Sequence, residues 1–147
     1  MSEKQLSVSI VSWEGNLYQS EALSVNMSVD NGELGVRPGH AQLLATFQPG
    51  PVRIETTNDS TWDSVYVSGG VIEVQPDQVI ILADEVERAQ NIDEAQAKMA
   101  KERAEALLVE NDQNSVDLAD AQEQLKQADA RLQAIAAMRG IHYSAKH

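Results

Sequence analysis

The pattern of apolar residues changes once along this 147-residue chain, and that change limits the folds open to it. Up to about residue 83 apolar and polar residues alternate with a period of two, which is typical of half-buried strands. From about residue 92 the chain is rich in Ala, Gln, Glu and Lys, lacks Pro, and repeats its apolar residues at helical spacing. We therefore predict an α+β chain with a strand domain at residues 1–88 and a helical domain at residues 89–147.

The strand domain is expected to contain many short strands separated by turns. Leu6, Val8 and Ile10 alternate with serines, as in a strand with one face in water. The expected strands are residues 6–10, 23–29, 43–47, 52–54, 62–67, 71–74 and 79–83. Because each strand needs a second sheet to cover its apolar face, we predict an antiparallel β-sandwich, or a flattened barrel, with an aliphatic core.

The helical domain is expected to be an antiparallel hairpin of two helices around a polar break at residues 110–114. Asn91 and Glu94 fit a capping box for the first helix, which should run to about Val109. Ser115 is expected to cap the second helix and Gly140 to end it. The predicted seams are Ala97, Ala100, Ala104 and Leu107 on the first helix, and Leu118, Ala121, Leu125, Ala128, Leu132 and Ile135 on the second.

The alanines in these seams bear on how firmly the hairpin holds together. An alanine buries far less surface than a leucine, so at about 25 cal/mol per Å² the seam is weak. Two interpretations stay open: a hairpin that can open, and a purely structural coiled-coil tail.

Composition excludes several classes of function. The net charge of −12 argues against nucleic-acid binding, which needs clustered Lys and Arg. The chain has no cysteine, so disulfides and thiolate metal sites are excluded. No apolar run approaches the roughly 18 residues of a membrane span, and we expect no such span.

Candidate catalytic residues are few. His40, His142 and His147 lack the spacing of metal ligands. The carboxylates between residues 84 and 87, Asp84, Glu85 and Glu87, fit an exposed, solvated turn better than an acid–base pair. Gly69-Gly70 lacks the Lys-Ser/Thr of a phosphate-binding loop. We therefore expect no active site, no metal and no cofactor.

Residues 30–41, Asp-Asn-Gly-Glu-Leu-Gly-Val-Arg-Pro-Gly-His-Ala, hold three glycines and a proline. Two tight hairpin turns would explain them, but their order favours a shaped loop. The part from Gly-Glu-Leu-Gly to Pro-Gly-His-Ala resembles the loop signature of the epsilon subunit of F-type ATP synthases. Residues 66–74, Tyr-Val-Ser-Gly-Gly-Val-Ile-Glu-Val, resemble its second hallmark, and residues 79–84 resemble its strand ending in Leu-Ala-Asp.

This resemblance implies a noncatalytic rotor subunit of a proton-translocating synthase. It implies a sandwich of about ten strands at the foot of the gamma subunit, in contact with the membrane c-ring, and a mobile C-terminal hairpin that can inhibit ATP hydrolysis. It also implies a peripheral position at the cytoplasmic face of the inner (plasma) membrane, attached only through the c-ring. The implied contacts to gamma and the c-ring are Asp30, Asn31, Gly32, Glu33, His40 and Leu44.

The resemblance also implies that the hairpin meets the alpha and beta subunits, with Lys126 and Arg131 toward acidic beta segments. Residues 92–97 match the ATP-sensing motif Ile/Leu-Asp-x-x-Arg-Ala of some members at Ile92, Asp93 and Ala97. Gln96 stands where that motif has Arg, so a fixed positive charge and a bidentate donor are missing. We therefore expect weak ATP binding at most, and weaker inhibition than in basic members.

One alternative belongs to another class: a β-sandwich binding module that forms homo-oligomers through its helices. Size and partners separate the two. The rotor subunit should be a monomer or a tight pair with gamma, whereas the binding module should form a homo-oligomer whose size depends on concentration.

Overall fold

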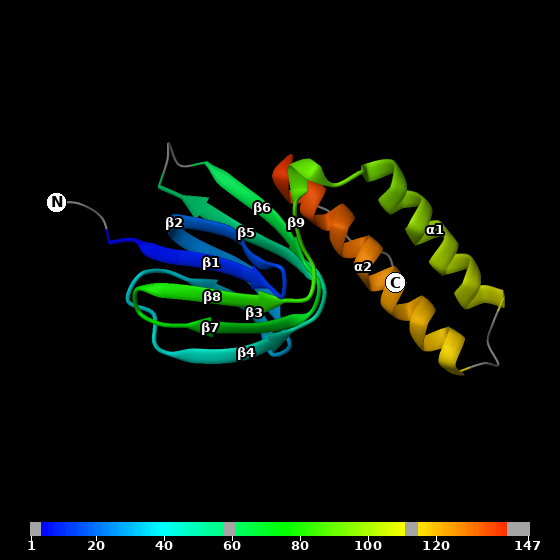
Figure 1. Ribbon diagram of the computed structural model, residues 1–147, viewed down its shortest axis with the longest axis horizontal. Coiled ribbons are helices and arrows are strands. Elements are labelled where there is room, and N and C mark those ends of the chain that lie inside the picture. Colours follow the sequence, from blue (N-terminus) through cyan, green and yellow to red (C-terminus); the bar gives the residue numbers. More distant parts are fainter. Residues whose placement is uncertain (1–3, 58–60, 111–114, 141–147) are drawn as a thin grey trace.

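The computed structural model describes residues 4–57, 61–110 and 115–140, which form a strand domain beside a pair of helices (Figure 1). Its strands are β1 Leu6–Ser12, β2 Gly15–Val29, β3 Gly32–Val36, β4 Leu43–Phe47, β5 Gly50–Thr56, β6 Trp62–Val67, β7 Gly70–Val74, β8 Gln78–Ala83 and β9 Val86–Arg88. The short 3₁₀ helix η1 Ala89–Asn91 leads to α1 Glu94–Glu110 and α2 Ser115–Met138. The predicted class, a sandwich followed by two helices, is confirmed.

The strands follow the order β4-β7-β8-β1-β2-β5-β6-β9, with β3 paired to β2. β2 is 15 residues long and pairs first with β1 and then with β3 and β5, so it belongs to both layers. The β1–β8 pair is parallel, unlike the antiparallel pairing that the sequence predicts. The difference arises because β8 reaches β1 from its hairpin with β7 and not through a turn shared with β1.

The course of β2 changes which of its side chains are buried. Its pairing with β5 shifts register between Ala22 and Ser24, and both residues are buried. Val25 is also buried, directly after Ser24, whereas Leu23 is only partly buried. The simple alternation predicted for residues 23–29 is therefore wrong at its start, because an irregularity of one residue moves the following side chains to the opposite face.

The core between the layers is mostly aliphatic, as the sequence predicts. Leu6, Val8 and Ile10 of β1 are fully buried, and Tyr18 and Phe47 are the aromatic side chains in this cluster. Isoleucines and valines of the other strands pack around them. The apolar side chains of the two layers thus bury one another, and the outer faces of the sheets remain available to partners and to α2.

Residues 30–41 are more regular than the expected shaped loop. Residues 32–36 form the edge strand β3, which returns along β2 after a tight turn at residues 30–31. Gly39 has a φ of 90° in the turn that follows, and its N–H donates to the Pro76 carbonyl at 2.7 Å. The prediction of a loop throughout this segment is wrong, since two turns enclose a strand.

The segment between the strand domain and the helices, residues 86–91, has regular secondary structure. β9 pairs with β6 and η1 follows directly, so the residues just before the expected domain boundary add a ninth strand to the sheet. A three-residue strand with two charged side chains has too little pattern to be recognised from sequence. The domain boundary at residue 88 stays a prediction.

The two helices pack as an antiparallel pair, and α2 lies between α1 and the strands (Figure 1). Asp93, not the predicted Asn91, caps α1, because its Oδ1 accepts the Gln96 N–H at 3.1 Å while Asn91 lies in η1. Gly140, with a φ of 72°, follows the end of α2. The side chain of the other predicted cap, Ser115, lies outside the described residues.

Ion pairs reinforce the seam between the helices. Ala97 and Ala104 of α1 are buried, as are Ala121, Ala128, Leu132 and Ile135 of α2. Lys101 Nζ lies 3.1 Å from an Asp129 carboxylate oxygen, and Arg139 lies 2.7 Å from Glu94. Hydrogen bonds from Arg139 and Lys98 hold the pKa of Glu94 below its usual value.

Candidate functional site

The described residues offer surfaces for contact and no metal centre. Within residues 4–57, 61–110 and 115–140, no group of three His, Cys, Asp or Glu side chains could hold a metal ion. In the same ranges no helix is both long and apolar enough to cross a bilayer. His142 and His147 lie outside the described residues.

The turn between β2 and β3 presents two carboxylates on a fixed backbone. Asp30 donates its N–H to the Thr46 carbonyl at 2.9 Å, and its carboxylate accepts the Thr46 hydroxyl at 2.5 Å. Glu33 accepts the Ser28 hydroxyl at 2.5 Å. Residues 30–33 are all exposed. The turn is therefore a rigid acidic projection.

The structure does not bring all the predicted contact residues together. His40 lies beyond the far end of β3, in the turn bonded to Pro76, and its Nδ1 is 2.7 Å from the Ala41 carbonyl oxygen. Leu44 lies on the edge strand β4 and is 71% exposed. Because five residues of β3 span about 17 Å, the acidic turn and His40 are separate features.

A second surface joins α2 to the sandwich. Ala130 and Ala134 of α2 pack against Tyr66 of β6 and Ala89 of η1, with Ile92 partly buried beside them. This face differs from the seam toward α1, and sequence reasoning missed it. The signal was the pair of alanines four residues apart, which lie on a second face of the same helix.

Strand β6 supplies the sandwich side of this interface. Val65 and Val67 point into the core, so Ser64 and Tyr66 face α2. The Ser64 hydroxyl donates to the Ala134 carbonyl at 2.7 Å in a buried position. This bond fixes the position of α2 along β6.

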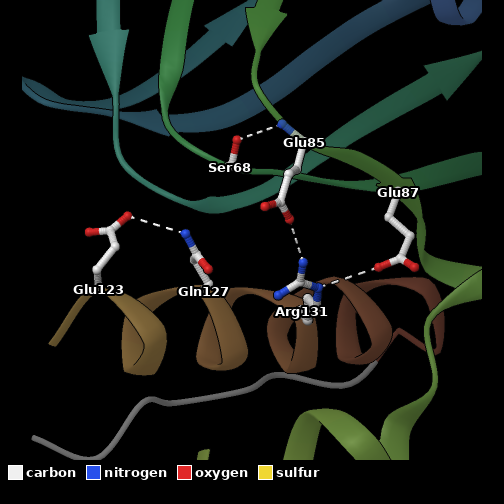
Figure 2. A network of polar contacts seen from close by, with 6 residues as sticks. All are labelled: Ser68, Glu85, Glu87, Glu123, Gln127 and Arg131. Carbon is white, nitrogen blue, oxygen red and sulfur yellow. Dashed lines mark hydrogen bonds and ion pairs between the residues drawn. The ribbon is translucent and has the colours of Figure 1, made fainter. Parts of the chain in front are cut away.

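Arg131 of α2 is the charged centre of the interface (Figure 2). Its guanidinium lies 2.7 Å from Glu85 and 3.4 Å from Glu87, and its central carbon is 4.4 Å from the centroid of the Tyr66 ring. The expected solvated turn at residues 84–87 is thus wrong in one respect, because two of its carboxylates bind a helix 46 and 44 residues further along the chain.

Tyr66 and Ser68 shape the surroundings of this arginine. Tyr66 is fully buried, and burial raises its pKa to about 12 although Arg131 acts to lower it. Its hydroxyl has no hydrogen-bond partner among the described residues. The Ser68 hydroxyl accepts the Glu85 N–H at 2.8 Å, and the Ser68 N–H donates to the Glu85 carbonyl at 3.0 Å. Ser68 therefore fixes both the N–H and the carbonyl of Glu85.

The residues that match the ATP-sensing motif have local structural contacts. Ile92 packs on the α2 interface, Asp93 caps α1, and Ala97 is buried in the seam between the helices. Gln96 is exposed, as is Lys126 of α2. An uncharged amide thus stands at the position that would hold the guanidinium.

Comparison with known proteins connects this architecture to one family. The ATP synthase delta/epsilon chain β-sandwich domain matches residues 5–89, and the long α-helix domain of the same chain matches residues 86–136. The ATP synthase epsilon chain of Francisella tularensis subsp. tularensis (strain SCHU S4 / Schu 4) is 40% identical over 144 residues, covering 98% of both chains. The epsilon chain of Francisella philomiragia subsp. philomiragia is 39% identical over the same length and shares.

Solved structures share the fold at lower identity. A chain of the Euglena gracilis mitochondrial ATP synthase superposes with a TM-score of 0.78 at 20% identity, covering 94% of this chain and 84% of that one. A chain of the Tetrahymena thermophila mitochondrial ATP synthase central stalk and c-ring gives a TM-score of 0.58 at 15% identity, covering 91% and 99%. Both likenesses concern the arrangement of strands and helices.

Proposed function

This chain belongs to the ATP synthase delta/epsilon chain family and is a noncatalytic rotor-stalk subunit, and we propose that its sandwich joins gamma to the c-ring while its helices regulate ATP hydrolysis. The observation that carries the proposal is the 40% identity over 98% of both chains, since the relatives' sandwich and helices are then both represented here. The chain works within an ATP synthase, at the cytoplasmic face of the membrane, and reaches the bilayer only through the c-ring.

The acidic turn supports the contact with the c-ring. Asp30 and Glu33 carry exposed carboxylates on a turn whose backbone and side chains are held by Thr46 and Ser28. A preorganised carboxylate pair loses little conformational entropy when it binds a basic loop. Leu44 lies two residues from Thr46 on β4, near the acidic turn, and is assigned to the same contact. His40 lies beyond the far end of β3 and is assigned to gamma or to another part of the ring contact.

The alanine-rich interface of α2 supports a regulatory role for the helices. Ala130 and Ala134 bury little surface against β6, so a shift between docked and extended forms needs only a few kcal/mol of differential contact. In the extended form α2 would follow gamma and meet the alpha and beta subunits. Its cations Lys126 and Arg131 would then face acidic beta segments. ATP has little affinity for the isolated chain, because Gln96 replaces the arginine.

A truncation after Arg88 tests this division of labour. The shortened chain retains all nine described strands, since β9 ends at Arg88. We expect a synthase that assembles and pumps protons, with ATP hydrolysis equal to or above that of the full-length complex. Hydrolysis and proton pumping are measured in membrane vesicles that carry either form. Release of the catalytic sector from the membrane would show that the helices are needed for assembly, and would contradict the proposal.

A further inference from the structure

Arg131 is held in the docked form by groups that all belong to the sandwich. Glu85 and Glu87 contribute carboxylates at 2.7 and 3.4 Å, and Tyr66 contributes the ring 4.4 Å away. The Arg131 side chain as a whole is 27% exposed, so most of its surface is covered in the docked form. We call this set of Arg131, Glu85, Glu87 and Tyr66 the arginine clasp.

The sandwich side of the clasp is organised by its backbone. Glu87 is paired with Tyr66 across the β6–β9 ladder, which places both side chains on one face of the sheet. Glu85 is fixed through its own N–H and carbonyl by Ser68 (Figure 2). The backbone that carries the two carboxylates is therefore positioned by the sandwich itself and does not depend on α2.

We propose that the clasp masks the charge with which α2 binds its partner, so that Glu85 and Glu87 compete with an acidic segment of that partner for Arg131. This inference rests on the proposed regulatory function and adds the groups that set its balance. In the docked form the guanidinium is neutralised within the chain. In the extended form the same guanidinium is available, and the two states exclude each other because one cation cannot serve both sets of carboxylates.

The exposure of the clasp determines how strongly it acts. Glu85 and Glu87 are 55% and 39% exposed, so each ion pair should shift the docking equilibrium only about two- to five-fold. The stacking on Tyr66 adds a comparable factor. The clasp thus shifts the equilibrium toward the docked form only moderately. A partner that carries several carboxylates can therefore bind Arg131 in its place.

The first test measures docking in the isolated full-length chain. The protein has no cysteine, so a Ser64→Cys variant carries one thiol, at a position that α2 covers. Its rate of alkylation reports how often α2 leaves β6. Adding Glu85→Gln and Glu87→Gln together should raise that rate about five- to twenty-fold, and Arg131→Gln should raise it at least as much. Unchanged rates would overturn the clasp.

Two controls separate undocking from other changes. A Val65→Cys thiol faces the sandwich core one residue away, so its alkylation follows unfolding of the sandwich and should stay constant in all clasp variants. Glu73→Gln makes the same chemical change on β7, at an exposed position paired with β4. It should leave the Ser64→Cys rate unchanged.

The second test separates masking from docking in the assembled synthase. The Glu85→Gln and Glu87→Gln pair frees the cation, so ATP hydrolysis should fall below the wild-type rate. Arg131→Gln also loosens docking but removes the cation, so hydrolysis should not fall. If alkylation rises while hydrolysis is unchanged in the glutamate variant, masking is refuted. If truncation after Arg88 also leaves hydrolysis unchanged, the regulatory function itself fails and the docking role of the clasp remains.

Discussion

Single residues of the segment 66–70 connect the sandwich to the helices or pack its strands together. Tyr66 stacks under Arg131, and Ser68 holds the backbone of Glu85. Gly70 begins β7 and faces Ala83 of β8 in the ladder. Sequence reasoning identified this segment through a resemblance, and the structure gives separate physical tasks to three of its residues.

Gly70 is needed because two strands approach closely at this point. A Cβ on Gly70 would lie 1.9 Å from the Leu82 carbonyl oxygen, so Gly70→Ala must displace backbone. We expect the free energy of unfolding, measured by urea denaturation, to fall by about 2 to 3 kcal/mol. Gly50→Ala is the matched control, because its Cβ would meet nothing nearer than 3.8 Å. Equal stability of the two variants would contradict the close approach.

At the scale of elements, long periodic segments were predictable and short or shared ones were not. The seven expected strands and both helices follow from residues close in sequence, although the strand expected at residues 23–29 is only the second half of β2. β9 and the second buried face of α2 depend on pairing with β6, which lies about 20 and 70 residues away respectively. The same applies to Arg131, since nothing in its local sequence indicates Glu85 as its partner.

The start of α1 provides a test at this scale. Asp93 accepts the Gln96 N–H, whereas Asn91 lies one element earlier in η1. Asp93→Ala should therefore lower the stability of α1 by about 1 kcal/mol, seen as faster amide hydrogen exchange in its first turn. Asn91→Ala is the control and should leave this exchange nearly unchanged. The reverse result would restore Asn91 as the cap.

At the scale of the whole molecule, α2 uses two faces at once. One face meets α1 and the other meets β5 and β6, so the helix connects the hairpin to the sandwich. Self-association through α2 would have to displace one of these contacts. An alanine-rich interface with one exposed charged clasp is suited to reversible docking, because few large apolar side chains must be returned to water.

The acidic turn at residues 30–33 is far in sequence from the interface of α2. It provides a separate test, of the coupling between ATP hydrolysis and proton pumping. Glu33 is exposed and is held by Ser28, so Glu33→Lys reverses a charge with little effect on the sandwich core. If the turn faces a basic loop of the c-ring, the new like-charge contact should weaken that contact about tenfold or more. Proton pumping per ATP hydrolysed should then fall in membrane vesicles.

The control for this variant is Glu21→Lys, which makes the same charge reversal at an exposed position of β2 paired with β1. Net charge changes equally in the two variants, so a general effect on solubility or membrane attraction would appear in both. Loss of pumping in Glu33→Lys alone places the turn at the ring. Normal pumping in both variants would mean that the c-ring contacts the sandwich elsewhere than at the acidic turn.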